Sequence, residues 1–273
     1  MSEIFGSDAY SPKEIAKRVE IVGVTKARLP LLSMVMLGVM AGGFIGLGAL
    51  FFVLISSDAE LGFAARQGLG GVAFSLGLIL VVVAGAELFT GNNLLTMAWA
   101  ARKISTAELL QNWVVVCAAN FVGASGLALL VFFSAHPEMN NGAVAGRYLE
   151  IAIEKCSMPF WTAFSRGVLC NILVCMAIWM ALAGRSVFDK VVAIVFPITA
   201  FVAAGFEHSI ANMYLIPMGM LVKASGHVGL NADAVSWMGF LNNLVPVILG
   251  NLVGGSVLVG FVYYVIYLRS ESE

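Results

Sequence analysis

The chain has 273 residues, of which 60% are hydrophobic and 11% are charged, and its mean hydropathy is +0.94. A soluble domain of this length cannot bury so much apolar surface in one core, so the composition predicts an integral membrane protein. The 15 basic and 16 acidic residues nearly balance, which gives no indication of nucleic-acid binding.

The chain begins with a polar segment that has a helix-start pattern. Ser11 as N-cap, Pro12 at the first helical position and Glu14 at the third form a capping-box start. An apolar stripe lies opposite the charged residues and consists of Ile15, Val19 and Val22. We therefore predict a cytoplasmic amphipathic helix within residues 1–28 that lies on the membrane face, either as a plain anchor or as a movable lid.

Six apolar segments follow, at about 29–56, 68–101, 109–133, 160–183, 187–222 and 235–268. About 20 residues suffice to cross the hydrocarbon core as a helix, so the second, fifth and sixth segments have length to spare. We predict an all-α membrane protein with one six-helix transmembrane domain at 29–268 and a cytoplasmic tail at 269–273.

Two pairs of motifs show that the domain is duplicated. GAELFTGN at 85–92 corresponds to GFEHSIAN at 205–212, and NFVGAS at 120–125 corresponds to NLVGGS at 251–256. We predict repeat one at 29–134 and repeat two at 158–268. The first motif pair falls in the overlong second and fifth segments, so we expect both of these helices to be broken near the bilayer midplane. Asn120 and Asn251 lie on small-residue helix faces, where interhelical hydrogen bonding is the expected role.

The distribution of lysine and arginine indicates the orientation. Basic residues concentrate in the N-terminal segment, the second-to-third and fourth-to-fifth loops and the C-terminus. The opposite side carries Arg66, Arg147, Lys155 and Lys223, and the loop histidines His136 and His227, which we expect to be solvated. The positive-inside rule then places both termini in the cytoplasm, and three spans per half make the repeat inverted, 3+3.

Residues that recur in both repeats are candidates for framework roles. Glu87 and Glu207 match, as do Asn92 and Asn212. A charge inside an apolar segment is costly and often marks an ion or substrate path. Because a broken helix exposes backbone N–H groups without partners, we expect these glutamates to accept hydrogen bonds from them.

Positions that differ between the repeats are better candidates for function. Leu88 corresponds to His208, and Thr90 corresponds to Ile210. An intramembrane histidine beside Glu207 is a functional candidate, although a lone buried histidine is commonly a satisfied core group. Thr90 can serve a central chamber or satisfy the backbone of a kinked helix. An inverted arrangement brings the histidine and the hydroxyl to one chamber.

ELFTGN at 87–92 and EHSIANM at 207–213 resemble the two signature stretches of the formate/nitrite transporter family, and the Ser11-Pro12 start with Glu14 is similar to its N-terminal helix. Within the family, the chain is most similar to the bacterial formate channels. The resemblance implies an aquaporin-like protomer and a homopentamer with one pore per protomer, in a bacterial inner membrane. It also implies passage of small monovalent anions, without cofactor or metal.

The resemblance implies site residues as well. His208 and Thr90 match the central pore pair, Asn171 matches a fourth-helix partner near Glu207, and Asn212 belongs to the second signature. Four residues match positions at apolar constrictions: Leu78, Leu88, Phe74 and Phe201. From the residues alone, these four would be assigned to core packing or to the lipid-facing surface.

These parts predict a channel or transporter for small anions, with formate as the favoured cargo. Lys26 on the inner side and Lys155 on the outer side are placed to raise the local anion concentration. Two mechanisms remain open: passage of the anion itself, or proton transfer from His208 so that the neutral acid crosses. A nitrite or hydrosulfide channel of the same family is the alternative.

More distant classes fit the sequence less well. A neutral-solute channel of the aquaglyceroporin type would carry paired Asn-Pro-Ala boxes, which the sequence lacks. ATP-driven transport is disfavoured because there is no GxxxxGK[ST] loop. One intramembrane histidine cannot hold a haem or a metal alone, so an enzyme is not predicted.

Overall fold

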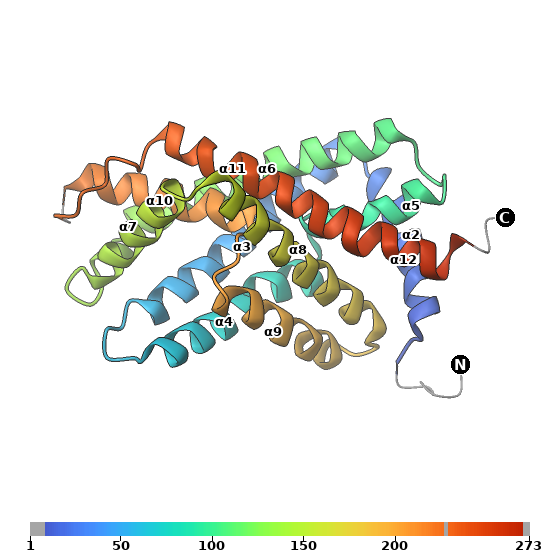
Figure 1. The fold of residues 1–273 in the computed structure, drawn as a ribbon, viewed down its shortest axis with the longest axis horizontal. Helices are drawn as coiled ribbons and strands as arrows, with labels where there is room; N and C mark the ends of the chain where they lie inside the picture. Colours follow the sequence, from blue (N-terminus) through green and yellow to red (C-terminus); the bar gives the residue numbers. More distant parts are fainter. Residues whose placement is uncertain (1–8, 227–228, 270–273) are drawn as a thin grey trace.

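The structure is a computed structural model that describes residues 9–226 and 229–269. Within this part of the chain, the regular structure is helical apart from one isolated bridge between Ala9 and Gly184. Figure 1 shows long helices running between two ends of the molecule, with α2 and α12 at one end and α7 at the other. His227, residues 1–8 of the predicted N-terminal segment and residues 270–273 of the predicted tail lie outside the described residues.

Helix α2 (Pro12–Ala27) begins with the predicted capping box. The Ser11 hydroxyl accepts a hydrogen bond from the Glu14 N–H, and the Glu14 carboxylate accepts one from the Ser11 N–H at 2.8 Å. Ile15 and Val19 are buried on the rest of the protein, whereas Val22 is exposed. The helix therefore packs on one end of the molecule with one face only.

Among the residues that the structure describes, five helices are long and apolar enough to cross a membrane. They are α3 (Leu31–Ser56), Phe63–Gly85, α6 (Thr106–Phe133), α8 (Phe160–Ala183) and Trp237–Tyr267. The second consists of α4 (Phe63–Leu80) and the π-helix η1 (Val81–Gly85). The fifth consists of α11 (Trp237–Leu252), the π-helix η4 (Val253–Phe261) and α12 (Val262–Tyr267). The predicted all-helical class with several apolar helices is confirmed.

The chain leaves the helical conformation inside both motif-containing segments. After Gly85, with φ +83°, it is extended at Ala86 and resumes as η2 (Gly91–Leu95) and α5 (Thr96–Ala100). Helix α9 (Val187–Ala203) is followed by Gly205, with φ +70°, and then by α10 (Ser209–Ser225). Glycine adopts these positive φ values without the steric cost of a side chain, so both turns fall at the glycine that opens each motif.

The segment between α6 and α8, expected to be a loop, contains a helix. It holds the short η3 (His136–Glu138) and the 14-residue α7 (Ala143–Cys156). The buried face of α7 includes Tyr148, whose hydroxyl lies 2.8 Å from that of Tyr214 on α10. His136 packs edge-on against Tyr148, with ring centroids 6.1 Å apart, and is half-buried rather than solvated. Helix α7 was not predicted because its apolar positions are too few for a membrane span.

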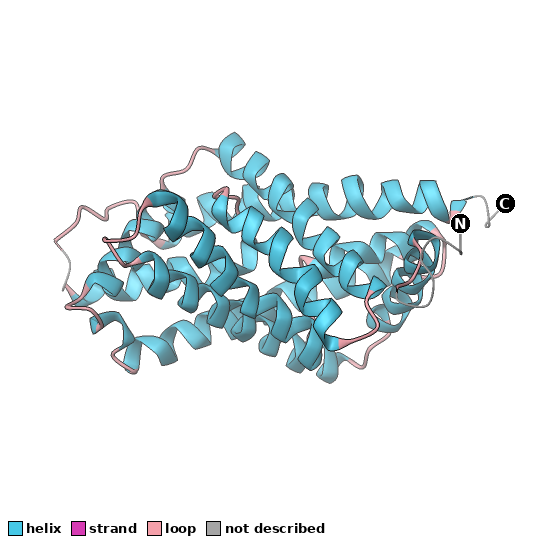
Figure 2. Cartoon of the chain, turned by 90° about the horizontal axis from the view of Figure 1, so that it is seen from below, coloured by secondary structure: helices cyan, strands magenta, loops and turns pink. Residues whose placement is uncertain are grey.

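Glycines allow two matched pairs of long helices to approach closely. A Cβ atom at Gly123 of α6 would collide with the Val39 carbonyl of α3. A Cβ atom at Gly254 of η4 would collide in the same way with the Val168 carbonyl of α8. The two motifs NFVGAS and NLVGGS therefore include a glycine that sets an interhelical distance. Figure 2 shows the resulting bundle along a second direction.

Candidate functional site

The two nonhelical segments meet at a buried hydrogen bond between His208 and Thr90. Nε2 of His208 lies 3.0 Å from Oγ1 of Thr90, and both side chains are buried. His208 is also the N-cap of α10, because its Nδ1 accepts a hydrogen bond of 3.1 Å from the Ala211 N–H. A nitrogen that accepts carries no proton, so in the neutral ring the proton is on Nε2 and Thr90 is the acceptor.

A group of aromatic rings covers one side of this pair. The Phe201 ring stacks on the His208 ring with centroids 5.9 Å apart. Phe74 of α4 meets Phe201 edge to face at 5.6 Å. Leu88 precedes Thr90 by two residues and is buried, as is Leu78. Phe201 therefore lies against the polar pair and Phe74 against Phe201, and all four apolar residues that the resemblance indicates belong to one buried cluster.

Two hollows approach the pair from different directions. The first, of about 130 Å³, reaches His208 and is lined by Phe74, Phe201 and Lys155 among others. The second, of about 450 Å³, is mostly apolar and is lined by Leu88 and by Lys26 of α2 among others. The hollows share no lining residue, and Leu78 lines neither. We call them the His208 vestibule and the Leu88 vestibule.

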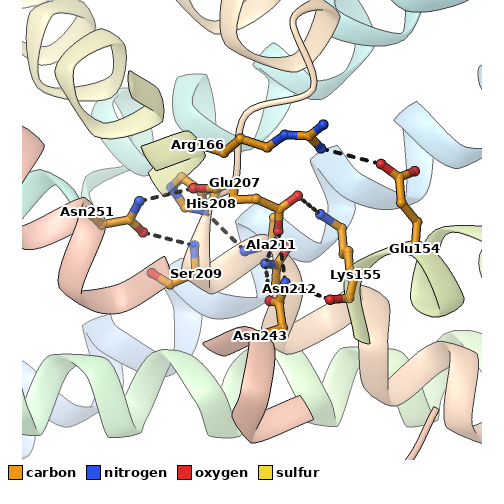
Figure 3. A network of polar contacts seen from close by, with 10 residues as sticks. All are labelled: Glu154, Lys155, Arg166, Glu207, His208, Ser209, Ala211, Asn212, Asn243 and Asn251. Carbon is orange, nitrogen blue, oxygen red and sulfur yellow. Dashed lines mark hydrogen bonds and ion pairs between the residues drawn. The ribbon is translucent and has the colours of Figure 1, made fainter. Parts of the chain in front are cut away.

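A buried ion pair forms the wall of the His208 vestibule. The Lys155 ammonium lies 2.7 Å from the Glu207 carboxylate, which also accepts a bond of 2.6 Å from the Asn212 amide. Asn212 donates further to Asn243 at 2.7 Å, and Asn243 donates to the Lys155 carbonyl at 3.1 Å. Figure 3 shows this closed network, which ties α7, α10 and α11 together.

The Leu88 vestibule carries the same network built from other residues. Lys26 lies 2.9 Å from the Glu87 carboxylate, which accepts a bond of 2.6 Å from Asn92. Asn92 donates to Asn112 at 2.9 Å, and Asn112 donates to the Lys26 carbonyl at 3.2 Å. The α2 helix is therefore fixed by a polar contact as well as by its apolar face.

The backbone at both breaks is satisfied by asparagine, not by glutamate as we expected. Oδ1 of Asn120 accepts a bond of 2.9 Å from the Phe89 N–H, and Oδ1 of Asn251 accepts one of 3.0 Å from the Ser209 N–H. Their amide groups donate to the carbonyls of Glu87 and Glu207. An amide supplies both donor and acceptor, which a carboxylate cannot do, so it matches both peptide groups of a broken helix.

Asn171 bonds the backbone at Thr90, and Glu207 is not among the hydrogen-bond partners that the described residues offer it. Its amide nitrogen is 3.2 Å from the Thr90 carbonyl, 2.8 Å from Asn93 Oδ1 and 2.7 Å from the Asn251 carbonyl. Its Oδ1 is buried without a hydrogen-bond partner among the described residues. Asn171 therefore holds the Thr90 backbone in place, and its oxygen is available as an acceptor.

Lys26 and Lys155 lie at the vestibules as expected, but each is engaged in an ion pair. The Lys26 side chain is 28% exposed and the Lys155 side chain is 13% exposed. Asn112 belongs to the Lys26 network and Asn243 to the Lys155 network, and neither was predicted. They precede Asn120 and Asn251 by the same spacing, a signal present in the sequence. Groups of His, Cys, Asp and Glu able to hold a metal ion are absent from the described residues.

Comparisons with known proteins agree with this arrangement. The family model described as formate/nitrite transporter matches residues 13–265. The formate channel FocA of Escherichia coli K12 is 40% identical, with 97% of each chain covered, and the formate channel FocA of Haemophilus influenzae is 37% identical, with 93% of each covered. A solved structure described as a pentameric formate channel with formate bound matches with a TM-score of 0.80 and 38% identity, covering 88% of this chain and 98% of that one.

The fold is that of a membrane transport protein. The chain belongs to the formate/nitrite transporter family, as the two signature stretches predicted.

Proposed function

We propose that this protein is a bacterial inner-membrane channel that passes formate and related small monovalent anions through a pore in each protomer. The observation that carries the proposal is the His208–Thr90 pair, which lies between two vestibules that each contain a lysine. The proposed path runs from the His208 vestibule past Phe74 and Phe201 to the His208–Thr90 pair. From the pair it continues past Leu88 into the Leu88 vestibule. The formate channels among the relatives support formate as the cargo.

The architecture that goes with this function is an inverted 3+3 repeat of six spans, aquaporin-like, in which the second and fifth spans are broken. The matched networks of Lys26 and Lys155 support it, since equivalent residues make equivalent hydrogen bonds. The second span comprises Phe63–Gly85 and α5, and the fifth comprises α9 and α10. The repeats include the helices α2 and α7, which supply the two lysines.

An anion that leaves water for an apolar constriction needs compensating interactions. The positive end of the α10 dipole begins at His208 and offers part of that compensation. The Nε2–H of His208 offers a hydrogen bond that the anion accepts in place of Thr90. The buried Asn171 oxygen has no hydrogen-bond partner among the described residues and can accept a bond from a protonated species or a water.

The N-cap role of His208 favours passage of the anion with the ring acting as a neutral donor. A ring that gives away its Nε2 proton must take up another at Nδ1, and this nitrogen already accepts the Ala211 N–H. Proton transfer to formate therefore requires the first turn of α10 to lose its cap. Hydrogen bonding without transfer leaves the cap intact.

The proposed assembly is a homopentamer with both termini in the cytoplasm. The pentameric relative supports the oligomer, and the excess of lysine and arginine on the side of α2 supports the orientation. On this assignment, the Leu88 vestibule opens to the cytoplasm and the His208 vestibule opens to the periplasm.

Flux into proteoliposomes tests the proposal. Purified protein should admit formate at a rate well above that of protein-free vesicles, with nitrite, hydrosulfide, chloride and glycerol measured in parallel. Flux of nitrite or hydrosulfide that exceeds formate flux would assign the alternative cargo. Glycerol flux without formate flux would assign a neutral-solute channel and refute the proposal.

A further inference from the structure

A surface groove lies at the end of the molecule that holds α2 and α12, apart from the pore. It consists of two adjoining open hollows of about 640 and 430 Å³. Both are lined by Arg102, Phe261 and Tyr264; Trp99 and Lys103 line the first and Val265 lines the second. We call these six residues the rim groove. None of them lines either vestibule.

Two cations in the rim groove have no protein partner. The side chains of Arg102 and Lys103 are exposed, and neither makes a hydrogen bond or ion pair with any residue that the structure describes. The neighbouring Arg28 differs, because its guanidinium lies 2.9 Å from the Glu108 carboxylate. The groove therefore has an excess of positive charge that an anionic group can neutralise.

Arg102 has a left-handed backbone conformation just after α5. Arg102 has φ +57° and ends α5, with its N–H donating to the Trp99 carbonyl at 2.9 Å and the Lys103 N–H donating to the Ala98 carbonyl at 2.9 Å. Glycine is the usual residue at such a left-handed helix end, since other side chains add steric cost there. An arginine in this position is held by the helix end beside both hollows.

The rest of the groove is aromatic and aliphatic. Trp99, Phe261 and Val265 are exposed, and the Trp99 indole N–H donates to the Thr106 hydroxyl at 3.0 Å. Tryptophan and tyrosine next to basic residues are typical of the membrane–water interface. Unpaired cations beside exposed apolar side chains fit an amphiphilic ligand. Such a ligand carries a phosphate and hydrocarbon chains in one molecule.

We infer that the rim groove binds an anionic glycerophospholipid, with the headgroup phosphate on Arg102 and Lys103 and the acyl chains along Phe261 and Val265. The inference uses the proposed orientation only to place the groove in the cytoplasmic leaflet. Binding itself follows from the charge and apolar surface of the groove. The lipid would then be a component of the channel's surface and not part of its pore.

Native mass spectrometry of the detergent-purified full-length protein tests this inference. Dioleoyl-phosphatidylglycerol should bind more tightly than dioleoyl-phosphatidylcholine. The double variant Arg102→Gly, Lys103→Gln should lose that preference, by about fivefold per charge removed. Glycine suits the backbone at position 102, so the variant keeps its fold. The control Arg66→Gln, Lys190→Gln removes two charges outside the groove and should bind as the wild type does.

Several results would overturn the inference. Equal binding of both lipids to the wild type, or an equal loss in the control, would show that the groove has no specific role. Displacement of the lipid by glycerol phosphate at matched concentration would assign a soluble phosphate instead. A changed oligomer mass of the double variant without lipid would show that the groove is a contact between copies. Lipid binding is measured independently of formate flux. A protein that passes no formate would refute the proposed function without affecting the inference about lipid binding to the groove.

Discussion

Nε2 of His208 lies 3.0 Å from Oγ1 of Thr90, and this bond joins the two nonhelical segments of the chain across the middle of the molecule. The same ring caps α10 through Nδ1. One side chain therefore serves structure with one nitrogen and faces the proposed permeation path with the other. Substitutions that keep the role of one ring nitrogen and remove that of the other are the sharpest tests of the site.

The variant His208→Asn should retain formate flux within about fivefold of the wild type. Asparagine is a good N-cap and keeps an amide donor, so α10 and the hydrogen bond to the anion both survive. His208→Phe removes both and should reduce flux by about tenfold or more, as the loss of one hydrogen bond of about 1.4 kcal/mol implies. Proteoliposome flux with simultaneous proton measurement distinguishes the two. Abolished formate flux in a folded His208→Asn variant would favour proton transfer by the ring.

Breaking the Lys155–Glu207 pair should destabilise the protein strongly. Lys155→Met leaves the buried carboxylate unpaired, at a cost of about 3 kcal/mol. The double variant Lys155→Met, Glu207→Gln should be more stable than the single one, because no unpaired charge remains. Thermal unfolding in detergent measures both. Glu150→Gln at the more exposed Arg147–Glu150 pair is the control and should cost less than about 1 kcal/mol. Additive losses in the double variant would contradict the pairing.

Asn120→Ala and Asn251→Ala should each destabilise the fold by about 1 to 3 kcal/mol, because the N–H and carbonyl groups at a break lose their partners. Asn120→Asp and Asn251→Asp should be as destabilising, because aspartate lacks the amide donor and buries a charge. Unfolding of the detergent-solubilised protein checks this, with Gln111→Ala on the exposed face of α6 as control. Full stability of both alanine variants would show that the breaks hold without these side chains.

Acid should loosen the first turn of α2. The Glu14 carboxylate accepts hydrogen bonds from the Ser11 hydroxyl and from the Ser11 N–H. Both bonds lower the pKa of the carboxyl from the ordinary 4.5, and the bond from the hydroxyl contributes more. A depressed pKa stabilises the folded helix fully above pH 4.5, and this stabilisation is lost as the pH falls through the lower pKa of the folded state. Hydrogen exchange of the first turn, corrected for intrinsic rates, should accelerate below pH 4.5 in the wild type. Glu14→Ala, which removes the acceptor, should show fast exchange at every pH, whereas Glu20→Gln should behave as the wild type.

The sequence predicted much of this site because the chemistry is local to short motifs. Glu87 and Glu207 lie in apolar segments, where a carboxylate requires polar partners. The duplicated motifs indicated which residues of the two halves are equivalent. The partners themselves come from distant helices, so the pairing of Asn120 with the Phe89 N–H was not predictable from spacing. Asn171 was expected near Glu207, and its bonds to the Thr90 and Asn251 carbonyls were not predictable because side-chain direction depends on how α8 packs.

The helix α7 shows a second limit of the sequence analysis. Its 14 residues fall outside the length that marks a membrane span, and hydropathy alone assigned them to a loop. The equivalence of Lys26 and Lys155 appears only when the contacts with the two glutamates are known. A repeat that includes surface helices is invisible when only apolar segments are aligned.

The unequal exposure of those two lysines makes the mouths of the pathway differ in their response to ionic strength. Mobile ions screen an exposed pair much more than a buried one. Salt added on the side of Lys26, which is 28% exposed, therefore weakens its attraction for Glu87 and for incoming anions, whereas Lys155 at 13% is shielded by protein. Concentrated salt should therefore weaken the Lys26–Glu87 pair more than the Lys155–Glu207 pair, so two ion pairs of the same composition differ in their sensitivity to the medium.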